Sequence, residues 1–236
     1  MSANRNAALQ YPRVLFAAVF ISGLISSLAG CASGPPPPDW HADAKSALDR
    51  TVVAYLKGDS RVEAAEFERA RGHIARTGRP ELLARAELMR CAAQVASLAF
   101  DPCEGFDRLQ ADAAAPERAY AQHLAARALP RAEIELLPPE QRSAAAALAG
   151  PADASPASVQ AIADPLSRLI AVAVLFRAGK ASPALIAQAA DTASAQGWRR
   201  PLLAWLEVQA LLADKAGDAN EAQRLRRRIA VVQLGK

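Results

Sequence analysis

Much of the apolar content of this chain is alanine, and this restricts the fold more than any single motif does. Hydrophobic residues make up 52% of the sequence, whereas aromatic residues make up only 5%. Alanine favours helix and lets two helices approach closely. The runs of valine, isoleucine, threonine and aromatic residues that strands require are missing after Cys31. The sequence after Cys31 therefore predicts an all-α protein.

Turn residues divide the N-terminal half, residues 39–150, into segments whose apolar residues recur at helical spacing. In the first segment, Ala44, Leu48, Val52 and Tyr55 fall on one face. Glycine, proline and capping residues mark where helices stop and start. The predicted helices cover residues 39–58, 61–76, 81–98, 103–113, 116–129 and 140–149, with a short apolar piece at 134–137.

A proline-rich break at residues 150–156 separates this half from the C-terminal half, residues 151–236. Prolines 165 and 201 lie 36 residues apart, and glycines 179 and 217 lie 38 apart. A period of this size is typical of paired-helix repeats. The sequence predicts stacked antiparallel helix hairpins, arranged as an α-solenoid or an irregular bundle, with C-terminal helices over 165–176, 183–195, 201–216 and 219–232.

The last of these hairpins resembles a tetratricopeptide repeat. Its second helix follows Gly217-Asp218 and carries Glu221-Ala222, and Ala210 stands where the first helix needs a small residue. Two positions depart from that motif, because Ala213 replaces the usual aromatic residue and Arg226 stands near the usual second-helix aromatic. The resemblance covers about 36 residues closely. It implies stacked hairpins with a groove for peptides or proteins, and it carries no catalytic residues.

The first 30 residues have the three-part plan of a secretory signal peptide. Arg5 and Arg13 precede an apolar run that begins at Val14 and closes on small residues before Cys31. A membrane-spanning helix needs about 20 mainly apolar residues. This run is shorter and contains serines and Gly23, so we expect a cleaved leader rather than an uncleaved anchor.

The end of this leader, Leu28-Ala29-Gly30-Cys31, resembles the lipobox of bacterial lipoproteins. The resemblance implies cleavage between Gly30 and Cys31, a diacylglycerol on the Cys31 sulfur, and palmitate on the new N-terminus. Residue 32 is alanine rather than aspartate, which in the best-known sorting rule implies the outer membrane, with the anchor facing the periplasm. Residues 31–38 then form a lipidated cysteine and a proline-rich tether that reaches roughly 20 Å from the lipid.

The charge of the mature chain gives no reason to expect a nucleic-acid partner. The formal net charge is +4. Two of those positive charges are Arg5 and Arg13 in the leader, so about +2 is left on the 206 residues after position 30.

Two thiols besides Cys31 are present, Cys91 and Cys103. The signal peptide directs the chain to an oxidising compartment, where disulfides persist. A bridge requires Cα atoms within about 7 Å, so the chain has to double back after the third helix. We expect a Cys91–Cys103 disulfide, and the alternative is two buried free thiols.

No catalytic, cofactor or metal motif is recognisable in the sequence. His41, His73 and His123 form no ligand pair, and Glu133 and Glu135 fit a solvated loop next to prolines. The densest basic patch lies in the last helix and is a possible binding patch for anionic lipid or an acidic partner; the simpler explanation is favourable charge near a helix C-terminus. This patch comprises Arg224, Arg226, Arg227 and Arg228.

Three classes of function stay open at this stage. The first is a non-catalytic scaffold or adaptor in the cell envelope, which contacts other envelope proteins. The second is a helical module that binds a small ligand or a cell-wall glycan fragment. The third is a hydrolase with an unrecognised site. An open apolar face would favour the first, a deep polar pocket the second, and a buried His–carboxylate or Ser–His contact the third.

Overall fold

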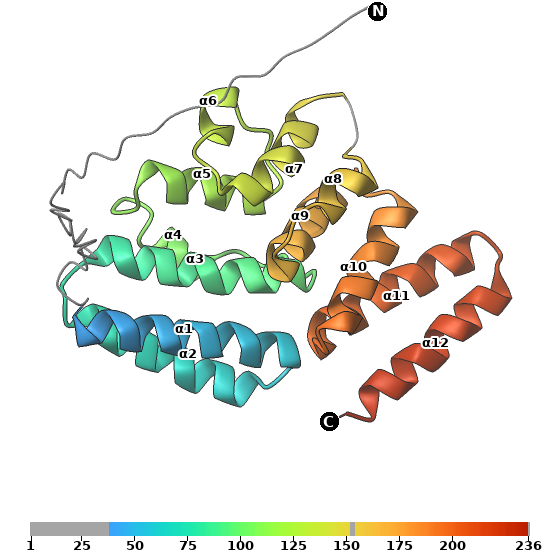
Figure 1. Ribbon diagram of the computed structural model, residues 1–236, viewed down its shortest axis with the longest axis horizontal. Helices are drawn as coiled ribbons and strands as arrows, with labels where there is room; N and C mark the ends of the chain where they lie inside the picture. Colours follow the sequence, from blue (N-terminus) through green and yellow to red (C-terminus); the bar gives the residue numbers. More distant parts are fainter. Residues whose placement is uncertain (1–37, 152–153, 236) are drawn as a thin grey trace, which may run out of the picture. The chain divides into compact units, whose positions relative to one another are not determined.

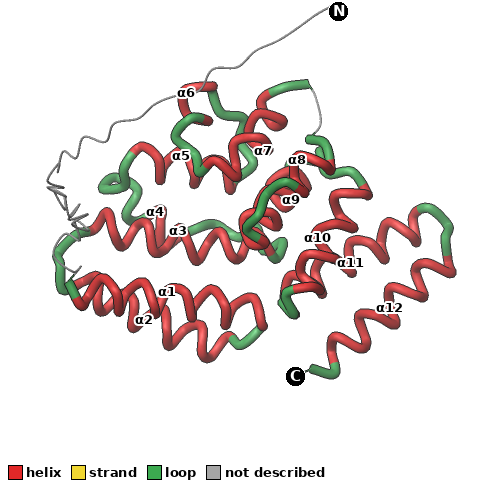
Figure 2. The backbone as a smooth tube through the Cα atoms, viewed as in Figure 1, coloured by secondary structure: helices red, strands yellow, loops and turns green. Residues whose placement is uncertain are grey.

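The computed structural model describes residues 38–151 and 154–235, and within them it is all helical, as the sequence predicts (Figures 1 and 2). The described helices cluster into one unit. They are α1 (Asp39–Lys57), α2 (Ser60–Ala75), α3 (Pro80–Ala96), α4 (Glu104–Asp107), α5 (Ala115–Leu124), α6 (Arg131–Ile134), α7 (Pro139–Ala149), α8 (Pro156–Gln160), α9 (Pro165–Arg177), α10 (Pro183–Ala195), α11 (Arg199–Lys215) and α12 (Ala219–Gln233).

Two hairpins, α1–α2 and α11–α12, are closed by the same Gly-Asp turn (Figure 1). Gly58 and Gly217 have φ angles of 87° and 74°, a conformation that glycine adopts without the steric penalty of a Cβ atom. The following aspartate then caps the next helix: Asp59 accepts from the Val62 N–H and Asp218 from the Glu221 N–H, both at 3.0 Å. The predicted turns are confirmed at both places.

Helix α9 lies at the centre of the main hydrophobic core. Every residue from Leu169 to Leu175 is buried, and α9 packs against α3, α7 and α10. A helix that is apolar all round is expected to be covered on all sides. The core thus includes residues from both sides of the 150–156 break.

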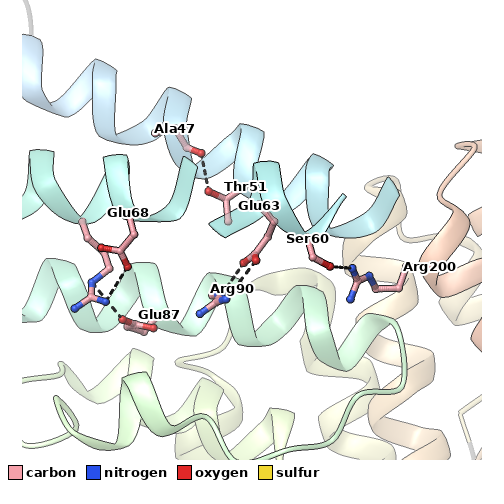
Figure 3. Close-up of polar contacts among 9 residues, drawn as sticks. Ala47, Thr51, Ser60, Glu63, Glu68, Glu87, Arg90 and Arg200 are labelled. Atoms are coloured by element: carbon pink, nitrogen blue, oxygen red, sulfur yellow. Dashed lines mark hydrogen bonds and ion pairs between the residues drawn. The ribbon is translucent and has the colours of Figure 1, made fainter. Parts of the chain in front are cut away.

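Helix α11 joins the two halves of the chain by specific contacts. The Trp205 ring is fully buried, meets Phe176 edge to face at 5.6 Å, and donates from Nε1 to the Ala96 carbonyl at 3.2 Å. The Arg200 guanidinium lies 4.1 Å from the centre of the Tyr55 ring. It also donates to Ser60 Oγ at 2.8 Å (Figure 3). In a simple repeat array each repeat contacts only its neighbours, so these contacts favour the irregular bundle.

Two predicted helices are shorter than expected. Helix α4 ends at Asp107 rather than near Ala113. The residues that follow form turns in which a backbone N–H donates to the carbonyl three residues earlier, so the α-helical pattern stops. Helix α5 ends at Leu124 rather than Leu129, where Ala126 takes a left-handed conformation with φ of 58°. Helix α8, which begins at the last residue of the 150–156 break, was not predicted.

The predicted disulfide between Cys91 and Cys103 is confirmed, with Cα atoms 5.9 Å apart. Helix α3 ends at Ala96, and Leu98, with φ of 59°, reverses the chain. Cys103 then stands at the N-terminus of α4 and lies against the flank of α3. This reversal provides the doubling back that the bridge requires.

Residues 1–37, which include the predicted signal peptide, the predicted cleavage point between Gly30 and Cys31 and most of the predicted tether, lie outside the described residues. Pro38 is described and precedes the first residue of α1. Within residues 38–151 and 154–235, no helix combines the length and apolar character needed to cross a membrane.

Candidate binding groove

Helix α3 borders an apolar depression on the side of the α1–α2 hairpin. This depression has a volume of about 410 Å³. Its walls come from α1, α2 and α3, and the apolar part of the lining comprises Trp40, Ala44, Leu48, Ile74, Leu82 and Met89. Ala44 and Ile74 are buried, whereas Trp40 and Leu82 are only partly covered.

A second depression, of about 390 Å³, lies on the other side of the same helix. Helix α3, the first turn of α5 and the segment before α7 form its walls, and the apolar lining comprises Leu88, Met89, Pro116, Leu136, Leu137 and Pro138. Leu137 is buried, but Leu136 is 41% exposed. An exposed leucine beside a depression leaves apolar surface available to a binding partner.

Arg85 and Met89, one turn apart on α3, line both depressions. We call the two depressions with this shared ridge the α3 groove. The Met89 side chain is 37% exposed, and methionine adapts its shape to different apolar partners. From Leu82 to Met89, α3 rises about 10 Å. The α3 groove thus presents two adjacent apolar binding points with a charged residue between them.

The charged group on this ridge is paired with a carboxylate from α5. Arg85 Nε donates to Glu117 Oε1 at 2.8 Å, and Arg85 Nη2 lies 2.5 Å from the same oxygen. The Arg85 side chain is 62% exposed, whereas the Glu117 side chain is only 10% exposed. The second carboxylate oxygen, Glu117 Oε2, is buried and has no hydrogen-bond partner among the described residues. A buried carboxylate oxygen without a donor is an unfavourable arrangement.

Behind the second depression, a buried polar chain holds α5 in place. His123 Nε2 lies 3.1 Å from Gln141 Oε1, and Gln141 Nε2 donates to the Ser167 carbonyl at 2.9 Å. Burial lowers the pKa of His123 to about 4, so the ring is neutral at neutral pH. The Tyr120 ring stacks on His123 at 6.2 Å and lines the depression, and burial raises the pKa of its hydroxyl. Because His123 is fully buried and bonded to an amide, its contacts are those of a structural residue.

Two other buried carboxylates, both on α2, are bonded at both oxygens. Arg90 donates to Glu63 Oε1 at 2.6 Å and to Oε2 at 3.3 Å (Figure 3). Glu66 accepts from Arg50 at 2.9 Å and from Arg69 at 2.6 Å, one on each oxygen. These ion pairs join α2 to its neighbours and leave no acceptor unused. Glu117 differs from both, because its Oε2 is buried and has no donor among the described residues.

Of the residues singled out in the sequence, the arginines of α12 do not join the α3 groove. Arg224 pairs with Glu221 and Arg226 with Asp214, both at 2.6 Å. Arg227 is exposed and Arg228 is partly buried. Two of the four charges are thus compensated within the last hairpin, and binding by this patch stays a prediction.

The three histidines are dispersed in the structure. His41 lines the first depression, His73 lies 3.8 Å from Asp43, and His123 is in the buried chain described above. In the part of the chain that the structure describes, no group of three or more His, Cys, Asp or Glu side chains is placed to hold a metal ion.

Sequence reasoning missed the residues that make the α3 groove. Arg85 and Glu117 lie 32 positions apart, so no local pattern joins them. The third predicted helix, residues 81–98, has a broad apolar arc that includes Met89 and predicts a position near the middle of the core, but Met89 is partly exposed. The one available signal was the width of that arc, which exceeds what a helix covered on one side requires.

Comparisons with protein-family models, with curated proteins and with solved structures found no match.

Proposed function

We propose that this protein is a lipid-anchored periplasmic lipoprotein of the outer membrane that acts as a non-catalytic adaptor between envelope proteins. The anchor and the location are supported by the signal peptide and by the lipobox-like Leu28-Ala29-Gly30-Cys31. Two or more acyl chains would give stable membrane attachment, since each buried CH₂ contributes about 0.8 kcal/mol.

The observation that carries the adaptor role is the α3 groove. Two apolar depressions of similar volume lie side by side and share the Met89 side chain. A polypeptide that presents two apolar side chains about two helical turns apart fits this arrangement, as in helix-in-groove recognition. We propose that the occupant is such a segment of a partner protein.

A small-ligand function is the second candidate. Each depression lies within the range of about 300–1,000 Å³ that is typical of ligand pockets. The second one also combines apolar walls with the polar groups of Glu117 and Tyr120. In that case a cell-wall fragment or another small molecule would occupy only one depression.

The adaptor proposal is tested by capture from intact cells. Cells are crosslinked, the protein is purified through a C-terminal tag, and the partners are identified by mass spectrometry. We compare the unmodified chain with Met89→Glu, which puts a charge between the two depressions, and with Val53→Glu as control. Val53 is 43% exposed on α1, close to the 37% of Met89, and lies in the lining of neither depression.

We expect one stoichiometric envelope protein with the unmodified chain and with Val53→Glu, and its loss with Met89→Glu. Equal recovery from all three proteins would contradict docking in the α3 groove. If only abundant porins are recovered, the small-ligand function gains support, and cell-wall fragments are screened next.

The anchor is tested separately with Cys31→Ala. We expect this variant to be soluble or unprocessed. If it still fractionated with the outer membrane after a carbonate wash, the lipid-anchor proposal would be wrong.

A further inference from the structure

The carboxylate of Glu117 is the feature of the α3 groove that its apolar lining does not explain. Its side chain is 10% exposed, which is comparable to the 6% of Glu63 and the 9% of Glu66. Those two glutamates have an arginine nitrogen at each of their oxygens. Glu117 has Arg85 on Oε1 only, and Oε2 is buried without a donor.

Glu87 has the same side-chain exposure but lies in a different environment. The Glu87 side chain is also 10% exposed, with Arg71 at 3.9 Å, and burial raises the pKa of its carboxyl. It borders a cavity of about 470 Å³ that is lined with charged side chains, among them Arg71, Arg90 and Arg108. Glu117 instead borders a depression whose other lining residues are mostly apolar, where few groups of the protein can satisfy it.

Glu66 shows what a second cation would do at such a carboxylate. It accepts Arg69 on one oxygen and Arg50 on the other, at 2.6 and 2.9 Å. The Arg69 and Arg50 side chains are 65% and 52% exposed, so a buried carboxylate in this protein accommodates two arginines that extend into solvent. Charge-assisted hydrogen bonds of this kind are stronger than neutral ones.

We infer that the partner segment in the α3 groove carries a lysine or arginine flanked by apolar residues, and that this basic group pairs with the Glu117 carboxylate. The flanking apolar side chains occupy the two depressions, and the basic side chain crosses the ridge formed by Arg85 and Met89. This inference rests on the proposed docking function and adds the charge of the partner. A segment with the basic residue gives the carboxylate a hydrogen-bond donor that it lacks in the free protein, so this segment binds more tightly than a purely apolar one.

Selection from a random-peptide phage library tests the inference. The target is the mature lipidated chain in detergent micelles. Counter-selection uses Met89→Glu, so that only peptides that need the α3 groove are kept. We expect the selected peptides to share a lysine or arginine with apolar residues on both sides.

The affinity of a selected peptide is then measured by fluorescence anisotropy. We expect Glu117→Gln to weaken binding about tenfold or more, since it removes the charge from the acceptor. Glu68→Gln is the matched control, because Glu68 also pairs with one arginine but its side chain is 68% exposed. This control should bind as the unmodified chain does.

A second measurement needs no protein variant, and so it holds even if Glu117→Gln fails to fold. The basic residue of the peptide is replaced by norleucine, which keeps the aliphatic stem and removes the charge. We expect a loss of affinity of about tenfold. Unchanged affinity would overturn the inference.

The outcomes separate this inference from the proposed function. Peptides that require Met89 but share no basic residue would contradict the role of Glu117 and leave docking in the α3 groove intact. If no selected peptide loses its binding when Met89→Glu is the target, both this inference and docking in the α3 groove would be contradicted.

Discussion

The contribution of the disulfide to stability can be worked out from its place in the chain. Cys91 and Cys103 are 12 positions apart, and the bridge closes a short loop in the unfolded chain. In the chain-entropy description, closing a loop of about this length removes roughly 9–10 cal/mol/K from the unfolded state. At 25 °C this stabilises the folded protein by about 3 kcal/mol.

Urea unfolding of the oxidised and reduced forms of the same protein measures this contribution without a mutation. With a slope of about 2–3 kcal/mol/M for a domain of this size, we expect reduction to lower the unfolding midpoint by about 1–1.5 M. Alkylation of the denatured protein without reductant is the control, and it should modify neither Cys91 nor Cys103. Coincident midpoints, or two alkylated thiols in the untreated protein, would refute the reasoning.

Three further variants test the packing described here. Trp205→Ala removes a fully buried ring and its hydrogen bond to Ala96, and we expect a loss of about 3–5 kcal/mol in urea unfolding, whereas Leu234→Ala, at an 84% exposed position, should change stability very little. Arg200→Ala removes the contact with the Tyr55 ring and the bond to Ser60, and we expect a loss of about 1 kcal/mol, against almost none for Arg227→Ala. The pKa of His123 is about 4 in the folded protein and 6.5 ordinarily, so the unfolded chain binds more protons between these two pH values. The neutral His123 ring therefore contributes about 3 kcal/mol of folding stability above pH 6.5, and this contribution is lost as the pH falls toward 4. We expect His123→Gln to flatten this part of the stability–pH curve.

The parts of the fold that were predictable depend on local chemistry. A glycine free to take positive φ, followed by a capping aspartate, fixes both the end of one helix and the start of the next, as Gly58-Asp59 and Gly217-Asp218 show. A helix that is apolar on every side is expected at the centre of the core, and α9 lies there, with every residue from Leu169 to Leu175 buried. The predicted helix ends were wrong near Leu98 and Ala126, where non-glycine residues take the left-handed conformation. No residue preference in the sequence indicates such a turn.

The candidate groove was not predictable, because it depends on how distant segments pack. Apolar periodicity places Met89 on the core side of α3 but does not say how far neighbouring helices extend over it. The pairing of Arg85 with Glu117 requires α5 to return beside α3, after the disulfide and the short α4. The disulfide could be predicted for a different reason, because the leader-like N-terminus and the number of thiols are both read from the sequence, and the predicted oxidising compartment favours a bridge.

Site-specific photocrosslinking in intact cells tests the central claim most directly. A photoreactive amino acid is placed at position 89 of the full-length chain, and at position 53 as a control of similar exposure. If the α3 groove holds a partner protein, position 89 gives one discrete adduct with another envelope protein and position 53 does not. Adducts of equal yield at both positions, or none at position 89, would contradict the account.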